Sequence, residues 1–436
     1  MSYRVNAFRS RSSKVSVAAM IAGCLVVLPG AAQAQERGSK LEAEKEQAPR
    51  LEPVGARVGV FRAFLGLEGS AVYDDNVYAA EVGKRDDTFF KISPSVKLVA
   101  DTSSYKANFS AAADRYEYSK LDGENRTDWN VKGDVVTELL RDTSVTFNAG
   151  FRRATEERGA PDSPVTAVSP VRYESFTAGG GLSREVGRLQ ARTIVDYEKL
   201  NFDDGRQGNN VVINNDDRDR QTLALGGELS YEFSPGYRIY GRGLYDRVAY
   251  RLPIDDTGFN RDAKGYRITS GVKFDLTNVI SGEAFVGYMH RNYKDPAFRN
   301  YGGLAYGASL RWSPSRLTTI YINGNRGIQE TTQNGYRGFI STSAGARVEH
   351  DLTRFIQLTA GLRYDKNKYI LGAVRPPAVL PIDRDDDIVF ANLGLNYLLS
   401  RQVSFGASWE YGKRTSNALL SDYTRNKGTV FVRLTF

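Results

Sequence analysis

Charged side chains recur at alternate positions in several segments of this sequence of 436 residues. Glu228 and Glu232 precede the turn residues 234–236, and Arg238 and Arg242 follow them at the same four-residue spacing. Alternate residues of a strand share one face, so acids and bases spaced in this way line one face of a sheet. They could form ion pairs across strands, or select solutes by charge where that face borders water.

A hairpin with its turn at Ser234-Pro235-Gly236 would fix how these charges face one another. Cross-strand pairs of opposite charge contribute roughly 0.2 to 1 kcal/mol each. The spacing predicts three facing pairs, Phe233 with Tyr237, Glu232 with Arg238, and Glu228 with Arg242.

The sequence offers little for catalysis or metal binding. It has one Cys, Cys24, and two His, His290 and His350, which should lie near opposite ends of their strands. We therefore predict no enzyme, no cofactor and no metal site. The acidic run 214–219 has a calcium-like density of oxygen ligands, but it lacks the glycine and the bidentate glutamate of an EF-hand loop. A solvated loop is the interpretation that we favour.

The elements that position these residues have the period of β-strands. From Phe61 to Tyr73 the odd positions are mostly apolar and the even ones mostly polar, and the same alternation occupies 356–364 and 403–412. Many runs reach about 10 to 13 residues, which is the length that a tilted strand needs to cross a bilayer. A mean hydropathy of -0.43 excludes a bundle of membrane-spanning helices.

Short and long connections alternate between these strands. We count about eight short turns and nine long polar stretches, which gives about 18 strands. The prediction is an all-β fold, a transmembrane antiparallel β-barrel with short periplasmic turns and long extracellular loops. The long stretches are 74–87, 118–126, 155–171, 201–218, 248–263, 292–301, 328–337, 366–385 and 413–425.

The N-terminus has the layout of a secretory signal. Basic residues precede an uncharged stretch, 15–28, and an Ala32-Gln33-Ala34 cleavage site. We predict a signal peptide over 1–34 that is cleaved near Ala34, a flexible periplasmic arm over 35–55, and the barrel over 56–436. A lipoprotein signal ending at Cys24 is the alternative. Cleavage after Ala34 removes four basic residues and no acid, so the net charge of +8 falls to +4 and no nucleic-acid partner is predicted.

The last strand carries a candidate assembly signal. Val432, Leu434 and the terminal Phe436 share one apolar face. An aromatic C-terminus of this kind resembles the signal that the outer-membrane barrel assembly machinery reads. The alternative is an ordinary edge strand, although an open apolar edge would promote aggregation.

Several short motifs carry a resemblance to a known family. Tyr73-Asp74-Asp75-Asn76-Val77-Tyr78, 92–96, 214–220 and 231–236 resemble, in this order, the family described as putative beta-barrel porin 2, from Gram-negative outer membranes. The resemblance covers nearly all of the chain after the signal. It implies a location in the cell outer membrane, lipid and lipopolysaccharide as neighbours, and a role beside exopolysaccharide or capsule machinery, including periplasmic polysaccharide-export components. It implies no catalytic residues.

The charged residues at alternate strand positions are expected to line the lumen. Eleven basic and eight acidic residues fall on the polar face, a small excess that favours neutral or anionic solutes, unless neighbouring charges simply neutralise one another. The favoured function is a channel for exopolysaccharide export or secretion. The alternatives are a general small-solute porin and a non-conducting barrel that anchors surface glycan. The pore-lining candidates are Arg62, Arg192, Glu228, Glu232, Arg238, Arg242, Arg267, Lys273, Arg311, Arg347 and Arg363.

A long loop folded inward could narrow such a lumen. The connection from about Asn367 to Asp386 is among the longest, and it combines the apolar stretch 370–381 with an acidic run. We expect this loop, or 201–218, to form a constriction, the alternative being a mobile external loop.

Overall fold

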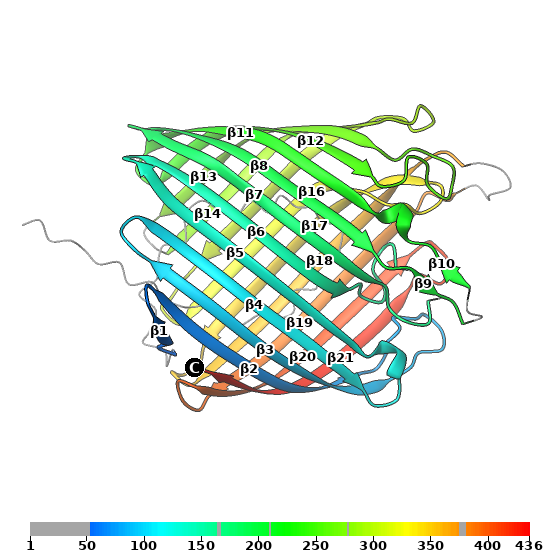
Figure 1. Ribbon diagram of the computed structural model, residues 1–436, viewed down its shortest axis with the longest axis horizontal. Helices are drawn as coiled ribbons and strands as arrows, with labels where there is room; N and C mark the ends of the chain where they lie inside the picture. The colour runs from blue at the N-terminus through cyan, green and yellow to red at the C-terminus, as the bar shows by residue number, and fades with distance from the viewer. Residues whose placement is uncertain (1–52, 164–166, 209–210, 277–278, 375–380) are drawn as a thin grey trace, which may run out of the picture.

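The alternating segments form eighteen long strands that close into an antiparallel barrel (Figure 1). The computed structural model describes residues 53–436 except 164–166, 209–210, 277–278 and 375–380. Each long strand pairs with its neighbours in sequence, and β21 pairs with β2 to close the sheet. The barrel strands are β2 (Phe61–Asp74), β3 (Asp87–Asp101), β4 (Tyr105–Tyr118), β5 (Arg126–Leu140), β6 (Thr143–Thr155), β7 (Arg172–Val186), β8 (Leu189–Phe202), β11 (Arg220–Ser234), β12 (Tyr237–Tyr250), β13 (Ala263–Leu276), β14 (Ile280–Tyr293), β15 (Tyr301–Trp312), β16 (Thr318–Gln329), β17 (Tyr336–Asp351), β18 (Ile356–Leu371), β19 (Asp385–Leu398), β20 (Val403–Ser416) and β21 (Tyr423–Thr435).

Five short elements accompany the barrel. β1 (Ala56–Val58) forms a small hairpin with the start of β2. β9 (Gly205–Arg206) pairs with β10 (Val212–Ile213) inside the connection between β8 and β11. Two 3-10 turns, η1 (Asp122–Glu124) and η2 (Asp216–Arg218), also belong to long connections.

The pleat places apolar side chains on the outer face of the barrel. Leu65, Leu67 and Tyr73 of β2 are exposed, whereas Phe64 and Ser70 at intervening positions are buried. A closed barrel puts one face of every strand toward lipid and the other toward the lumen, so exposed apolar residues mark the outside. The polar alternates therefore line the inside.

The predicted fold class is confirmed. Eight short and nine long connections alternate around the barrel. The short ones lie at one end of it and the long ones at the other (Figure 1). Two predicted loop boundaries are wrong, because β18 continues to Leu371 and β20 continues to Ser416. Polar residues beyond the apolar zone extend the ladder there, as where Lys366 pairs with Thr342 and donates to Asp387 Oδ1 at 3.3 Å.

The predicted signal peptide and most of the predicted arm, residues 35–52, lie outside the described residues. Residues 53–55 precede β1 without regular structure. Among the described residues, no helix has the length and the apolar character of a membrane-spanning helix.

Candidate functional site

An ion-paired cluster occupies the inner wall at β11, β12 and β13. Arg242 Nε lies 2.9 Å from Glu228 Oε2, and Lys273 Nζ lies 2.5 Å from Glu228 Oε1. Arg242 also approaches Glu283 of β14, with Nη2 at 3.4 Å from Oε1, and its guanidinium lies over the Tyr240 ring. The side chains of Arg242 and Glu228 are each only 4% exposed. Opposite charges at this level of the wall therefore neutralise one another.

A second cluster lies closer to the short turns. Arg238 Nη2 is 2.9 Å from both Glu232 Oε2 and Glu185 Oε1, and Nη1 donates to Gln190 Oε1 at 3.0 Å. Glu185 belongs to β7, three strands from Arg238, so the guanidinium reaches along the inner wall beyond its nearest neighbour. These contacts tie four adjacent strands together.

The remaining pore-lining candidates vary in their contacts. Arg347 pairs with Glu349 and lies over the Tyr321 ring. Arg363 Nε is 2.9 Å from Asp365 Oδ2. Arg62 differs from the others in being exposed, at the short-turn end of β2. The three that complete the set, each half-buried, are Arg192, Arg267 and Arg311.

The hairpin register predicted from the sequence is largely confirmed. Glu232 pairs with Arg238, and Glu228 pairs with Arg242. The prediction of Phe233 opposite Tyr237 is wrong, because Ser234 is the partner of Tyr237 and the register shifts between Glu232 and Ser234. A bulge of this kind inserts one residue into a strand and leaves it unpaired.

The C-terminal strand closes the sheet. The Phe436 amide donates to the Leu65 carbonyl at 2.8 Å, and the Leu65 amide donates to the Phe436 carbonyl at 3.1 Å. The side chains of Val432 and Phe436 are exposed on the outer face, whereas Leu434 on the same face is half-buried. Both the backbone and the side chain of the last residue therefore lie at the seam.

The connection between β6 and β7, residues 156–171, is anchored to neighbouring loops by buried ion pairs. Arg158 pairs with Glu124 of η1 and donates through Nη1 to the Ala167 carbonyl at 2.7 Å. Arg218 of η2 pairs with Glu156, and its Nη1 lies 3.2 Å from Glu156 Oε2. All four charged groups are almost fully buried, so each depends on its partner to offset the cost of desolvation.

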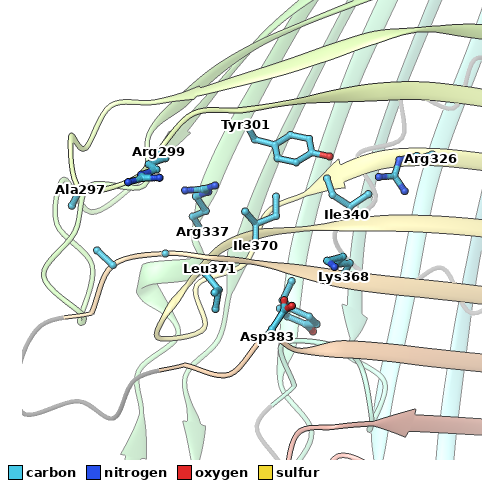
Figure 2. Close-up of a pocket in the computed structure, with 13 residues that line it drawn as sticks. Ala297, Arg299, Tyr301, Arg326, Arg337, Ile340, Lys368, Ile370, Leu371 and Asp383 are labelled. Atoms are coloured by element: carbon cyan, nitrogen blue, oxygen red, sulfur yellow. The ribbon is translucent and has the colours of Figure 1, made fainter.

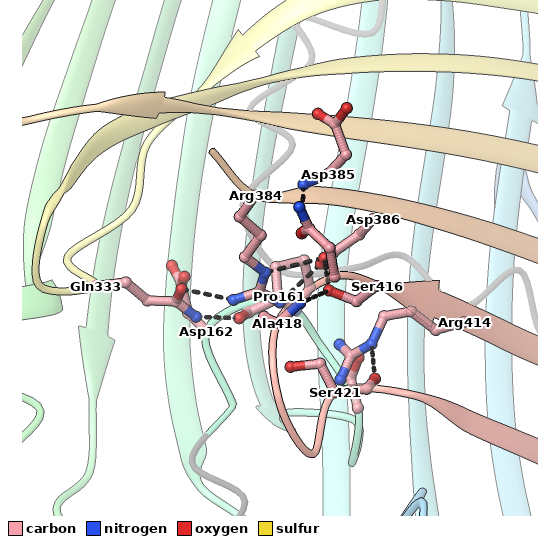
Figure 3. A network of polar contacts seen from close by, with 12 residues as sticks. Pro161, Asp162, Gln333, Arg384, Asp385, Asp386, Arg414, Ser416, Ala418 and Ser421 are labelled. Atoms are coloured by element: carbon pink, nitrogen blue, oxygen red, sulfur yellow. Dashed lines mark hydrogen bonds and ion pairs between the residues drawn. The ribbon is translucent and has the colours of Figure 1, made fainter. Parts of the chain in front are cut away.

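The same connection also contacts the connection between β16 and β17 and the strand β20 (Figure 3). Thr331 Oγ1, in the connection between β16 and β17, donates to Asp162 Oδ1 at 2.6 Å, and Gln333 donates to the Pro161 carbonyl. Arg414 of β20 donates through Nη1 to the Gly159 carbonyl at 2.9 Å. Residues 156–163 therefore bridge the loop-side mouth of the barrel, and we call this segment the mouth strap.

The mouth strap is a different loop from the two expected constrictions. The connection between β8 and β11 supports it through Arg218. The connection between β18 and β19 contributes Arg384, whose Nη1 donates to Gln333 Oε1 at 2.8 Å (Figure 3). Both expected loops therefore contact the mouth strap or its partners through described residues, and residues 375–380 lie outside the described residues. Their role as constrictions stays a prediction.

Neighbouring charges and burial shift the pKa values of two acidic residues in the loops. The cations Lys427 and Arg425 lower the pKa of Glu157 below its ordinary value, against the effect of burial. Burial, with the neighbouring Asp256 carboxylate, raises the pKa of Asp217 from 3.8 to about 6. Asp217 is thus an acid whose charge is poorly accommodated where η2 packs against the barrel.

Comparison with protein families matches residues 48–436 to the family described as putative beta-barrel porin 2. The chain belongs to this family. The porin family and the barrel together support an outer-membrane protein with a porin-like fold. No curated protein sequence matches the chain.

Several solved structures are similar to this chain at low sequence identity and low TM-score. OccK2 (OpdF) of Pseudomonas aeruginosa is 10% identical with a TM-score of 0.44, over 86% of this chain and 97% of that one. OccAB3 of Acinetobacter baumannii is 12% identical with a TM-score of 0.43, over 87% of this chain and all of that one. The ferric enterobactin receptor PfeA of Pseudomonas aeruginosa, as an R480A_Q482A mutant, is also 10% identical, over 85% of this chain and 80% of that one, with a TM-score of 0.44.

No group of three or more His, Cys, Asp or Glu side chains is placed to hold a metal ion within the described ranges. His350 Nδ1 lies 3.0 Å from Thr318 Oγ1, and His290 stacks on Tyr266. These contacts give both imidazoles a structural role in the wall.

Proposed function

We propose that this porin-family barrel is a gated outer-membrane channel serving the export or secretion of surface polysaccharide. The observation that carries the proposal is the charge-paired inner wall around Glu228, Arg242 and Lys273. Paired charges present many hydrogen-bonding groups with little net field, which suits an uncharged, hydroxyl-rich chain better than an ion. A barrel of 16 to 18 strands is wide enough for an aqueous channel.

The mouth strap supports gating. Buried ion pairs and contacts across the opening hold residues 156–163 in place, so passage of a polymer requires their displacement. In this proposal the partners are periplasmic export components, which deliver the chain, and lipopolysaccharide around the rim. The barrel assembly machinery would insert the protein through Val432, Leu434 and Phe436.

The bridged mouth also favours a second candidate, a non-conducting barrel that anchors glycan on the surface. The two functions differ in whether release of the mouth strap opens a pore. A general diffusion porin would need an open mouth without any such release.

Planar-bilayer recording on the full chain tests the proposal. We expect low conductance from the wild type and a several-fold increase from Arg158→Ala/Asp162→Ala, which removes the ion pair of Arg158 with Glu124 and the hydrogen bond of Asp162 with Thr331. A neutral dextran oligosaccharide should block the opened current. The matched control is Asp86→Ala/Lys120→Ala, because that ion pair is exposed on the loops and its two side chains contact each other rather than the mouth strap.

Three outcomes would contradict the proposal. A released variant without conductance would favour the anchoring barrel. A wild type that already conducts freely, and that dextran does not block, would favour the diffusion porin. Equal conductance in Arg158→Ala/Asp162→Ala and in the control would show that the mouth strap is not the gate.

A further inference from the structure

The barrel wall opens between β15 and β16 at their loop-side ends. β15 pairs with β14 over twelve residues, beginning at Tyr301. It pairs with β16 only from Tyr306 opposite Arg326 to Trp312 opposite Ile320, which is seven pairs. In the described part of the chain, residues 301–305 therefore have a ladder partner on one side only.

The neighbouring strands explain this separation. Ile340 of β17 and Ile370 of β18 lie on the outer face of their strands, yet they pack in one cluster with Met289 and Ala305, which lie on the inner face of β14 and β15. A Cβ on Gly338 would lie 3.1 Å from Tyr293 Oη, which shows the same close approach. The loop-side ends of β17 and β18 therefore tuck inside β14 and β15, and the wall has a step there.

A cavity of about 670 Å³ lies at this step (Figure 2). It combines cationic and apolar side chains, with one carboxylate, Asp383. The cations come from four different elements, and the apolar groups come mainly from β17 and β18. The cationic residues are Arg299, Arg326, Arg337 and Lys368, and the apolar ones include Ile340, Ile370 and Leu371.

These cations differ from the other arginines around the mouth. Arg158, Arg218 and Arg384 are each paired with a buried carboxylate. Over the described ranges, no carboxylate lies within ion-pair distance of Arg299, Arg337 or Lys368. Nε of Arg337 is buried without a hydrogen-bond partner. The cavity thus concentrates positive charge that the described protein leaves largely unneutralised.

The height of the cavity in the wall indicates what reaches it. Arg326 donates to Thr342 Oγ1 at 2.9 Å, and its register partner Tyr306 is exposed on the outer face, as are Tyr288 and Tyr364. Girdles of outward aromatic residues flank the apolar band of a membrane barrel and mark the boundary between the acyl chains and the headgroups of the bilayer. The cleft begins at this boundary and extends toward the loops.

We propose that this cleft binds the phosphate-bearing headgroup of an outer-leaflet lipid, with Arg299, Arg337 and Lys368 as its main contacts. Guanidinium groups match phosphate in geometry and charge. Ile370 and Leu371 line the cavity and give the start of an acyl chain apolar contacts there. The proposal concerns the wall of the barrel and holds whichever cargo the lumen carries.

Native mass spectrometry of the detergent-solubilised full chain provides the test, with bisphosphorylated lipid A as the probe. We expect wild-type protein to retain lipid A, and Arg299→Ala/Arg337→Ala to retain at least tenfold less. The matched control is Arg247→Ala/Lys264→Ala, two facing cations on the exposed outer surface near the loop-side ends of β12 and β13. Heat-modifiable gel mobility establishes that each variant is folded.

Lipid A without phosphates, inorganic phosphate, and a uronic acid oligosaccharide are the comparison probes. Loss of binding with dephosphorylated lipid A would support the proposal. Equal retention of both forms of lipid A would overturn it. Retention of inorganic phosphate or of the oligosaccharide in preference to lipid A would also overturn it, because the cleft would then recognise a free anion or an acidic glycan. An equal loss of lipid A binding in the Arg247→Ala/Lys264→Ala control would also overturn the proposal, because general surface charge would then explain the binding.

Discussion

Arg242 and Glu228 face each other across β11 and β12 and form a buried ion pair, with Nε 2.9 Å from Oε2. Glu228 has a second arginine as its register partner on the other side, Arg192 of β8. Arg192 is half-buried and forms no ion pair with Glu228 in the described structure. One carboxylate thus lies between two arginines of equal charge and different burial.

This contrast predicts unequal costs of truncation. Removing one partner of a buried pair leaves an uncompensated charge and costs about 3 to 5 kcal/mol, whereas an exposed pair contributes about 0 to 1 kcal/mol. We expect Arg242→Ala to lower the free energy of unfolding by about the first amount and Arg192→Ala by less than about 1 kcal/mol. Urea unfolding in detergent measures both.

Charge reversal at the same position gives a stricter test. Arg242→Glu would gather three carboxylates, because Glu228 and Glu283 are already there. Adding Glu228→Arg should recover much of the loss. Equal stabilities of the single and double variants would mean that the pair contributes little to the wall.

The register of this hairpin could be predicted because its determinants are local. A Pro-Gly turn and the alternation on either side fix which charges face one another, and the two observed charge pairs are those expected. The bulge at Phe233 could not be predicted, since the alternation of polar and apolar residues is compatible with a hairpin with or without one unpaired residue beside the turn. Strand count and closure likewise follow from repeated local patterns.

The mouth could not be predicted in this way. Thr331 and Asp162 are 169 residues apart, and neither loop carries a pattern that identifies the other. The step between β15 and β16 depends on Ile340 packing beneath β14 and β15, although its place in the alternation resembles that of any outward residue. Contacts between loops and between faces are set by the closed shape, which a single strand does not reveal.

The seam gives a prediction about assembly. Phe436 exchanges two backbone hydrogen bonds with Leu65, and its exposed side chain faces outward. A charge near the membrane interface costs only about 0 to 1 kcal/mol, so Phe436→Asp should hardly change the stability of a folded barrel. We still expect a large drop in folded protein in the membrane fraction, because we propose that the assembly machinery recognises the aromatic group. Thr435→Asp, with its side chain on the inner face, should insert at the wild-type level; a similar drop in both would exclude specific recognition of Phe436.

Asp217 predicts a pH dependence in the connection between β8 and β11. Its pKa is raised to about 6 by burial and by Asp256, so the folded loop favours the protonated acid. The packing of this loop should be strongest below the ordinary pKa of 3.8, weaken as the pH rises to about 6, and change little above that value. Limited proteolysis within 203–219 reports the change, with Asp217→Asn at each pH as the reference. Asp256→Asn should move the transition to lower pH, and an identical pH response in wild type and Asp217→Asn would contradict the assignment.

Substitution of two glycines can distinguish the effect of packing at the mouth from the effect of backbone strain. Gly159 in the mouth strap has φ +84°, and a Cβ there would lie 2.9 Å from Tyr423 Cε1 and 3.0 Å from Ala79 Cβ. Gly83 has φ +70°, and a Cβ there would have nothing within 4 Å. Alanine at either position takes on a left-handed backbone, at a cost of about 1 to 2 kcal/mol, but only Gly159→Ala also forces the mouth strap away from β21. We expect Gly159→Ala to raise single-channel conductance and Gly83→Ala to leave it unchanged, while both lower the unfolding free energy, Gly159→Ala by the larger amount. A conductance increase in both variants would indicate that general loosening opens the barrel, and no increase in either would mean that contact with Tyr423 does not hold the strap closed.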